Sequence, residues 1–205
     1  MSGSYDFTAD WFGRFAEIWR QVLKQHPAGK LLEIGSYEGR SACFLIEECA
    51  RERPIELHCI DTWAGGVEHN ADGMAQVEAR FDANIALARA TAAHPVAFHK
   101  HRSASHPALI QLLAAGGGER FDLVYVDGSH QAPDVLADAV LAFQLLKVGG
   151  VLIFDDYLWS MEAAGAQDAH NMPKAAIDAF VNVFQRKLTV LGAPLYQLYL
   201  VKTAA

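Results

Sequence analysis

The chain has 205 residues, of which 52% are hydrophobic and 20% are charged, with a formal net charge of −7 at pH 7. Its length and composition predict one folded domain, residues 1–205, with one substantial core. The negative charge argues against nucleic acid and anionic membranes as partners, and no apolar run approaches the roughly 18 residues of a membrane span. The sequence therefore predicts a cytoplasmic protein that binds a small neutral or cationic molecule.

The N-terminal segment, residues 1–29, is predicted to be helical. Over residues 8–25, apolar side chains from Trp11 to Trp19 and beyond recur at helical spacing, and Thr8 precedes them as a predicted N-cap. The apolar face of this helix is consistent with two arrangements. It packs on its own domain, or it forms a homodimer contact together with the last two strands.

Apolar β-forming runs alternate with helical patterns through the rest of the chain. Predicted strands are 30–36, 55–61, 96–103, 121–128, 151–156, 188–192 and 196–202. Predicted helices are 41–53, 74–93, 108–115, 133–147 and 173–186, with Gly149 and Gly150 as a helix stop. This order predicts an α/β fold: a Rossmann-like, doubly wound, mostly parallel seven-stranded sheet with an antiparallel C-terminal strand and helices on both faces.

Two irregular connections, residues 62–73 and 158–172, are long and polar for a compact domain and are predicted to be lid loops. They and their flanks mix aromatic and polar side chains, as a pocket for a hydroxylated small molecule does. The candidate pocket residues are Trp63, Glu68, Tyr157, Trp159, Met161, His170 and Asn171.

Polar residues stand at the ends of the predicted parallel strands. In an open α/β sheet, ligands bind outside the carboxyl ends of the strands, so these residues are expected to converge on one rim. They are Glu33, Asp61, Ser103, Asp127, Asp155 and Asp156.

The first strand leads into LEIGSYEGRS, residues 32–41. Gly35 and Gly39 allow a tight turn and a close approach to a ligand, and the next helix offers unpaired N–H groups to an anion. The spacing departs from the dinucleotide fingerprint G-x-G-x-x-G, and Glu33 suits an ammonium group better than a pyrophosphate. Asp61 at the second strand end suits a ribose diol. From the glycines alone, a plain strand-to-helix turn is equally consistent.

Together, E-x-G-x-x-x-G at residues 33–39 and the acid of CIDTW at 59–63 resemble the class I S-adenosylmethionine (SAM)-dependent methyltransferases. IDTWAGGVEH, YVDGSHQAPDVLADAVLAFQLLKVGGVLIFDDY and PKAAIDAF resemble, more narrowly, the small metal-dependent O-methyltransferases related to macrolide-sugar and catechol-type enzymes. The resemblance covers residues 30–202. Tyr37 departs from the wider superfamily, which often has a third glycine at this position.

The resemblance implies that the rim binds SAM. Glu33, Gly35 and Gly39 would line its methionine portion, and Ser41 would help to hold its carboxylate. Asp61 would take the ribose hydroxyls, and Thr62 or Trp63 would border the adenine, with Ser103 nearby. The full set of predicted SAM-binding residues is Glu33, Gly35, Ser36, Gly39, Ser41, Asp61, Thr62, Trp63, Ser103 and Asp127.

Asp127, Asp155 and Asp156 follow two predicted strands and are expected to repel one another unless a proton or a divalent cation is shared. Magnesium suits such a site because it binds few protein carboxylates and keeps waters and substrate oxygens. In the enzymes that the chain resembles, these three positions hold the ion, and the ion coordinates a substrate hydroxyl. The alternative is that Asp127 caps a turn and the other two are solvated loop acids.

His130 is the candidate general base, because the turn D-G-S-H brings it close to Asp127 and a neutral imidazole accepts a proton near pH 7. It is also consistent with a helix cap or with a residue that orients an aspartate. His99 and His101 alternate with Lys100 along a strand and are interpreted as flanking side chains rather than metal ligands.

The leading prediction is a divalent-metal-assisted transfer of the SAM methyl group to a hydroxyl of a small molecule, with phenols, catechols and sugars all open as acceptors. An NAD(P)-dependent oxidoreductase is one alternative, and the missing G-x-G-x-x-G counts against it. A non-catalytic SAM-binding protein is another, and the joint presence of Asp127, His130, Asp155 and Asp156 counts against it.

Overall fold

The computed structural model describes residues 4–67, 69, 71–116 and 118–205. Residues 1–3 of the predicted N-terminal segment, and Glu68 and Asn70 of the first predicted lid, lie outside them. The strands are β1 (Lys30–Ile34), β2 (Ile55–Asp61), β3 (Val96–Arg102), β4 (Phe121–Val126), β5 (Leu146–Phe154), β6 (Leu188–Val190) and β7 (Leu198–Lys202).

These strands form one sheet in the order β3-β2-β1-β4-β5-β7-β6. The pairs from β3 to β5 are parallel, whereas β7 is antiparallel to both of its neighbours. The predicted mostly parallel sheet with an antiparallel C-terminal strand is therefore confirmed. Because the sequence order reverses between β1 and β4, the carboxyl ends of these two strands border the crevice in which such folds bind ligands.

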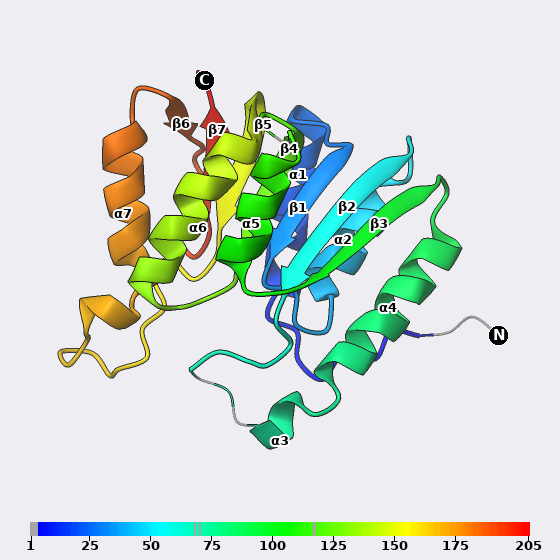
Figure 1. Cartoon of the computed structure of the whole chain (residues 1–205), viewed down its shortest axis with the longest axis horizontal. Coiled ribbons are helices and arrows are strands. Elements are labelled where there is room, and N and C mark those ends of the chain that lie inside the picture. Colours follow the sequence, from blue (N-terminus) through cyan, green and yellow to red (C-terminus); the bar gives the residue numbers. More distant parts are fainter. Residues whose placement is uncertain (1–3, 68, 70, 117) are drawn as a thin grey trace.

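Helices cover both faces of the sheet, as the strand–helix alternation predicted. They are η1 (Gly13–Phe15), α1 (Ala16–Gln25), α2 (Arg40–Cys49), α3 (Ala71–Met74), α4 (Val77–Thr91), α5 (Ser105–Ala114), α6 (Ala132–Leu145), η2 (Ala169–Asn171) and α7 (Pro173–Phe184). In Figure 1, α5 and α6 lie in front of the sheet and α1 and α2 behind it. One apolar core joins the sheet to α1, α2 and α4, and a second joins it to α5, α6 and α7.

The N-terminal helix is shorter than its sequence pattern predicts. It begins at Ala16 after a 3-10 turn, and Thr8 is not its N-cap. The backbone N–H and the hydroxyl of Thr8 instead donate to the buried carboxylate of Glu38 at 2.6 and 2.8 Å. Trp19 of this helix is fully buried against the sheet of its own domain. The apolar face therefore packs within the chain.

The glycines after α6 do not act as the predicted helix stop. The helix ends at Leu145, and β5 begins at once and contains both Gly149 and Gly150. Gly149 has a φ of 86°, and a Cβ on Gly150 would lie 3.0 Å from the carbonyl oxygen of Asp122 on β4. Here the glycines accommodate a register shift between β4 and β5. In the part of the chain that the structure describes, no helix is both long enough and apolar enough to cross a bilayer.

Candidate active site

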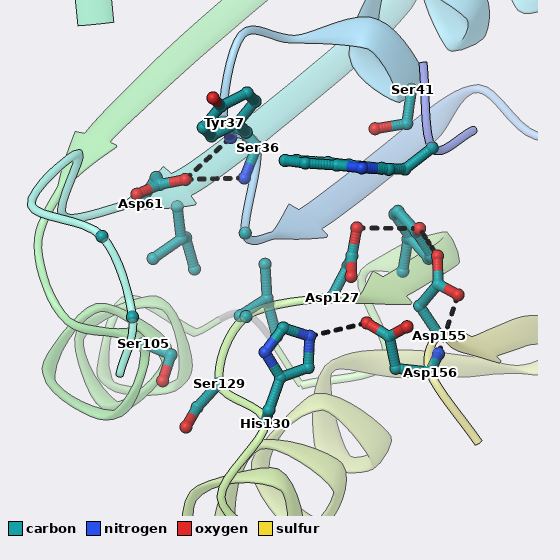
Figure 2. A pocket seen from close by; sticks show the side chains of 18 of the residues that line it. Ser36, Tyr37, Ser41, Asp61, Ser105, Asp127, Ser129, His130, Asp155 and Asp156 are labelled. Atoms are coloured by element: carbon teal, nitrogen blue, oxygen red, sulfur yellow. Dashed lines mark hydrogen bonds and ion pairs between the residues drawn. The ribbon is translucent and has the colours of Figure 1, made fainter. Parts of the chain in front are cut away.

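A cavity of about 800 Å³ lies at the carboxyl ends of the parallel strands. Figure 2 shows labelled side chains from several strand ends facing one another across it. Pockets of roughly 300–1,000 Å³ hold small ligands, so this one has room for a cofactor and a small acceptor. The sequence-predicted residues in its lining are Gly35, Ser36, Ser41, Asp61, Thr62, Ser103, Asp127, His130, Asp155 and Asp156.

The loop after β1 turns tightly against the end of β4. Gly35 has a φ of 82°, and a Cβ there would lie 1.8 Å from the carbonyl oxygen of Asp127, so only glycine fits. Gly39 also has a φ of 82° and packs behind the lining against Phe81. Tyr37, between them, has a φ of 47°. It adopts the left-handed conformation that glycine favours, and the loop keeps its turn without a third glycine.

Glu33 is fully buried beneath this loop, behind the cavity lining. The Ser36 hydroxyl donates to its Oε2 at 2.5 Å, and the Ser41 hydroxyl donates to its Oε1 at 2.6 Å. Burial raises the pKa of Glu33 to about 7, although both serine hydrogen bonds act to lower it. Glu33 therefore positions two serines that line the cavity. Its direct contact with an ammonium group stays a prediction.

Asp61 faces the cavity from the end of β2 and holds the same loop (Figure 2). Its Oδ2 accepts hydrogen bonds from the backbone N–H groups of Ser36 and Tyr37 at 2.8 and 2.9 Å. Its Oδ1 accepts one from the N–H of Trp63 at 2.6 Å. Each carboxylate oxygen has two lone pairs, so Oδ1 keeps one lone pair that can accept a hydrogen bond from a ribose hydroxyl. Trp63, predicted to border adenine, is buried and lies behind the lining.

Asp127, Asp155 and Asp156 form an aspartate cluster on the opposite wall, after β4 and β5 (Figure 2). The hydroxyl of Tyr125 lies between two of its members, in contact with Asp155 Oδ2 and 2.9 Å from Asp127 Oδ2. Asp155 Oδ1 accepts a hydrogen bond from the N–H of Asp156 at 2.7 Å. Asp156 has a φ of 54°, a backbone strain of the kind that concentrates at functional sites.

Repulsion between like charges shapes the electrostatics of the aspartate cluster. Burial raises the pKa of Asp127 well above its usual range, and Asp155 and Asp156 raise it further. Burial and the neighbouring Asp156 also raise the pKa of Asp155. Three carboxyl groups in one partly buried corner repel one another strongly when all are ionised and no cation balances them. The cluster therefore takes up either protons or a positively charged ligand.

His130 contacts the aspartate cluster directly. Its Nε2 lies 2.7 Å from Oδ2 of Asp156, and the ring of Trp159 stacks on the imidazole with centroids 4.1 Å apart. An ionised Asp156 accepts a hydrogen bond from Nε2, which leaves Nδ1 as the acceptor nitrogen of a neutral ring. This geometry suits a residue that orients an aspartate. Because Nδ1 is buried, the role of proton acceptor stays a prediction.

The donor set of the aspartate cluster fits a hard divalent cation, which prefers carboxylate oxygens. A second cavity, of about 10 Å³, is lined by all three aspartates and by His130, on the order of the space that one water molecule needs. The three carboxylates are not gathered around one point. Within the described residues, the group of three whose ligand atoms all lie within 4.8 Å is Glu56, His58 and His99. One or two carboxylates with water and substrate oxygens still suffice for magnesium.

Residues 32–157 of the 205 match the family described as a methyltransferase domain. The chain belongs to this methyltransferase family. The glycine loop, Asp61 and the aspartate cluster all fall within the matched segment. The family match supports the predicted methyltransferase and not the oxidoreductase alternative. No curated protein matches this methyltransferase at a significant level.

Several solved structures share the fold of this methyltransferase. The O-methyltransferase TomG from Streptomyces achromogenes, involved in tomaymycin synthesis and in complex with SAM, is 19% identical with a TM-score of 0.61, over 95% of this chain and 82% of that chain. The O-methyltransferase from Bacillus cereus in complex with SAH is 17% identical and has a TM-score of 0.59. The match covers 98% of this chain and 84% of that chain. The MycE methyltransferase from the mycinamycin biosynthetic pathway, in complex with Mg, SAH and mycinamycin VI, is 13% identical and has a TM-score of 0.63. The match covers 96% of this chain and 51% of that chain. At these identities the likeness establishes the fold.

The sequence analysis missed the polar residues behind the aspartate cluster of this methyltransferase. Gln197, buried, donates from Nε2 to Oδ2 of Asp155 at 2.8 Å and accepts at Oε1 from the indole N–H of Trp19 at 2.8 Å. Tyr125 carried a usable signal, because residues two apart on a strand share a face and Tyr125 stands two before Asp127. The sequence offered no such signal for Gln197, because this residue reaches Asp155 only through the antiparallel pairing of β7 with β5.

Aromatic side chains line the mouth of the cavity. The rings of Trp11 and Tyr37 lie 4.9 Å apart, those of Tyr37 and His69 lie 5.7 Å apart, and all three residues are in the lining. Trp159 from the second predicted lid also reaches the lining. The other described candidates from that loop and its flank lie outside the lining: Tyr157, Met161, His170 and Asn171.

Proposed function

We propose that this methyltransferase transfers the methyl group of SAM to a hydroxyl of a small molecule, with a divalent cation at the aspartate cluster. The observation that carries the proposal is that the glycine loop, Asp61, the aspartate cluster and His130 all meet at one cavity. The family match and the O-methyltransferases that share the fold support it.

SAM supplies an electrophilic methyl group on a sulfonium and requires a site for its charged methionine end and its ribose. The loop after β1, together with Asp61 at the end of β2, offers a site for each of these two parts. Ser36 and Ser41 are held on the carboxyl of Glu33 and present polar atoms to the cavity. Asp61 is held by three backbone N–H groups, so its carboxylate is already oriented before ribose hydroxyls arrive. We propose that the predicted SAM-binding residues in the cavity lining contact SAM directly and that those behind the lining hold them in place.

For the cation, we propose magnesium as the first choice, held by carboxylates of the aspartate cluster. A bound cation lowers the pKa of a coordinated substrate hydroxyl and favours its anionic form. The aspartates balance that positive charge in a partly buried corner. Tyr125 and Gln197 orient Asp155 from behind, as outer hydrogen-bond partners do at metal sites.

We propose that His130 accepts the proton of the substrate hydroxyl. A neutral imidazole accepts a proton near neutral pH, and the adjacent Asp156 stabilises the imidazolium that results. Trp159, stacked on the ring, covers one face of His130 against water. The aromatic residues at the mouth suit a moderately apolar acceptor such as a phenol or catechol, and a sugar hydroxyl is the second class to test.

The test is an assay of the full-length protein with SAM, Mg²⁺ and a panel of phenols, catechols and hydroxylated sugars, read by mass spectrometry of methylated products. We expect product with at least one class and loss of product on chelation. SAM binding measured by calorimetry without methylation of any compound, in Mg²⁺, Mn²⁺ or Ca²⁺, would support the non-catalytic SAM-binding alternative instead.

A further inference from the structure

A second group of ionisable side chains lies toward the other end of the sheet, on the edge pair β2 and β3 (Figure 1). Glu56, His58 and His99 each place a ligand atom within 4.8 Å of the others, and we call them the histidine cluster. None of the three lines the 800 Å³ cavity. His58 and His99 are direct partners in the parallel register, and Glu56 precedes His58 by two residues on the same face of β2.

The central histidine of this cluster is neutral and already oriented. His58 is buried, and burial lowers its pKa to about 4, although Glu56 acts to raise it. His58 Nδ1 lies 2.9 Å from Nε2 of His101, and its Nε2 lies 2.8 Å from Oε1 of Glu56. A metal-bound histidine characteristically has its second ring nitrogen hydrogen-bonded in this way, which fixes the ring. His101 thus serves as the orienting partner.

A cation already stands at the histidine cluster. The guanidinium of Arg120 contacts Oε1 of Glu56, and its Nη2 lies 3.2 Å from Nε2 of His58. The Lys30 ammonium lies 3.7 Å from the other carboxylate oxygen of Glu56. Since Glu56 Oε1 and His58 Nε2 both meet Arg120, they form the point at which a metal ion would replace the guanidinium. The side chain of Arg120 is partly exposed to solvent.

We propose that the histidine cluster is a second metal site, separate from the aspartate cluster, for a borderline transition-metal ion such as Zn²⁺. Imidazole nitrogens select Zn²⁺, Ni²⁺ or Cu²⁺ over Mg²⁺ and Ca²⁺, which prefer all-oxygen sites. Two histidines and one carboxylate, with water as the fourth ligand, make an open tetrahedral zinc set. Oε1 of Glu56 lies 2.8 Å from Nε2 of His58 and 3.9 Å from Nε2 of His99. The rings of His58 and His99 are stacked with centroids 4.2 Å apart, so the half-exposed His99 side chain would turn its ring to bind the ion.

The alternating pattern along β3 led us to interpret His99 as a flanking side chain, and the pairing of β3 with β2 gives it this different role. An ion held by Glu56, His58 and His99 joins the edge strand β3 to β2, so its expected effect is on the stability of the sheet edge. The inference does not depend on methyl transfer, because none of its residues belongs to the proposed catalytic site.

The test uses the full-length protein, treated with a chelator, dialysed, and titrated with Zn²⁺ by calorimetry in excess Mg²⁺. We expect one Zn²⁺ per chain and a rise in melting temperature. His101→Ala should weaken binding about 10–100-fold, and His99→Ala, which removes a ligand, should weaken it further. His94→Ala, outside the cluster, is the matched control and should bind as the wild type does.

Arg120→Gln distinguishes the proposed site from casual binding to surface histidines. If the guanidinium competes with the ion, its removal should tighten Zn²⁺ binding several-fold, and Co²⁺ should give the intense visible absorption of a tetrahedral site in this variant. Circular dichroism checks that each variant is folded. Equal Zn²⁺ affinity in the wild type and His99→Ala would overturn the proposal, and so would weaker binding in Arg120→Gln.

Discussion

The aspartate cluster and the histidine cluster lie on one sheet and solve the problem of buried charge in opposite ways. The aspartate cluster gathers like charges at the carboxyl ends of β4 and β5, and the pKa values of Asp127 and Asp155 rise. The histidine cluster pairs opposite charges. Burial would raise the pKa of Glu56, but the hydrogen bonds from His58 and Arg120 outweigh it and lower that pKa to about 2.

This difference indicates which cluster requires a ligand. Without a metal ion, the histidine cluster is balanced by Arg120, the group that the proposed Zn²⁺ would displace. The aspartate cluster reaches balance only by taking up protons or a cation, which is unfavourable for stability but suits a site that works on a charged intermediate. Excess charge at a cavity is therefore the stronger sign of function.

The largest effect is expected from Asp127→Asn, which removes one charge from the aspartate cluster and keeps an acceptor for Tyr125. Metal-dependent methylation should fall on the order of 10³-fold or more, because a catalytic cation supplies several kcal/mol. The metal-free protein should gain about 1 kcal/mol or more of stability as repulsion is relieved. Turnover and urea unfolding measure the two effects. Wild-type activity in this variant would remove Asp127 from the site.

His130→Gln should lower turnover by roughly 10²–10⁴-fold, the usual contribution of a general base, with little change in SAM affinity. Glutamine can still hydrogen-bond Asp156, so the variant separates proton transfer from positioning. The measurements are kcat and calorimetric SAM binding. His26→Gln, at a histidine outside the cavity lining, is the matched control. Unchanged kcat in His130→Gln would show that the residue only orients an aspartate.

Glu33→Gln tests the buried carboxyl beneath the β1 loop. Because burial raises the pKa of Glu33 from 4.5 to about 7, the folded state binds a proton that the unfolded state releases in this range. Its stabilising contribution is full below pH 4.5 and is lost as the pH rises through 7, on the order of 3 kcal/mol. The variant should lack this dependence in denaturant unfolding. An identical pH profile for both proteins would contradict the raised pKa.

Tyr125→Phe removes the hydroxyl that lies between Asp127 and Asp155 and should lower metal-dependent activity by about 10–100-fold, the usual cost of losing an outer partner of a metal ligand. The apparent metal affinity should fall with it. Tyr5→Phe is the control, since that hydroxyl donates to Glu47 and Tyr5 is outside the cavity lining. Equal losses in both variants would indicate general disturbance of the core.

The smallest effect is expected at the histidine cluster. Burial lowers the pKa of His58 from 6.5 to about 4, so the unfolded state binds a proton that the folded state does not. The stability that results is present above pH 6.5 and is lost as the pH falls through 4. We expect about 1–2 kcal/mol, less than for Glu33, because charged neighbours and solvent screen His58 more than they screen Glu33. His58→Gln should flatten this part of the unfolding profile. A profile unchanged by the substitution would contradict the lowered pKa of His58.

The sequence by itself determined the order of strands and helices and the acids on the rim of the sheet. These features depend on local physics: apolar periodicity sets the element type, and parallel strands bring residues such as Asp61 and Asp127 to one edge wherever they lie in the chain. The glycine at position 35 was equally readable, because a tight turn after a strand demands its conformational freedom.

Tertiary structure alone decided how those residues are used. Glu33 supports serines from beneath the loop, and Thr8 bonds to Glu38 instead of capping a helix. Gln197 reaches Asp155 across an antiparallel pair, and His99 meets His58 across a parallel one. Each contact depends on the register between segments far apart in the chain. Register is set by the packing of the whole sheet, which no local pattern of residues encodes.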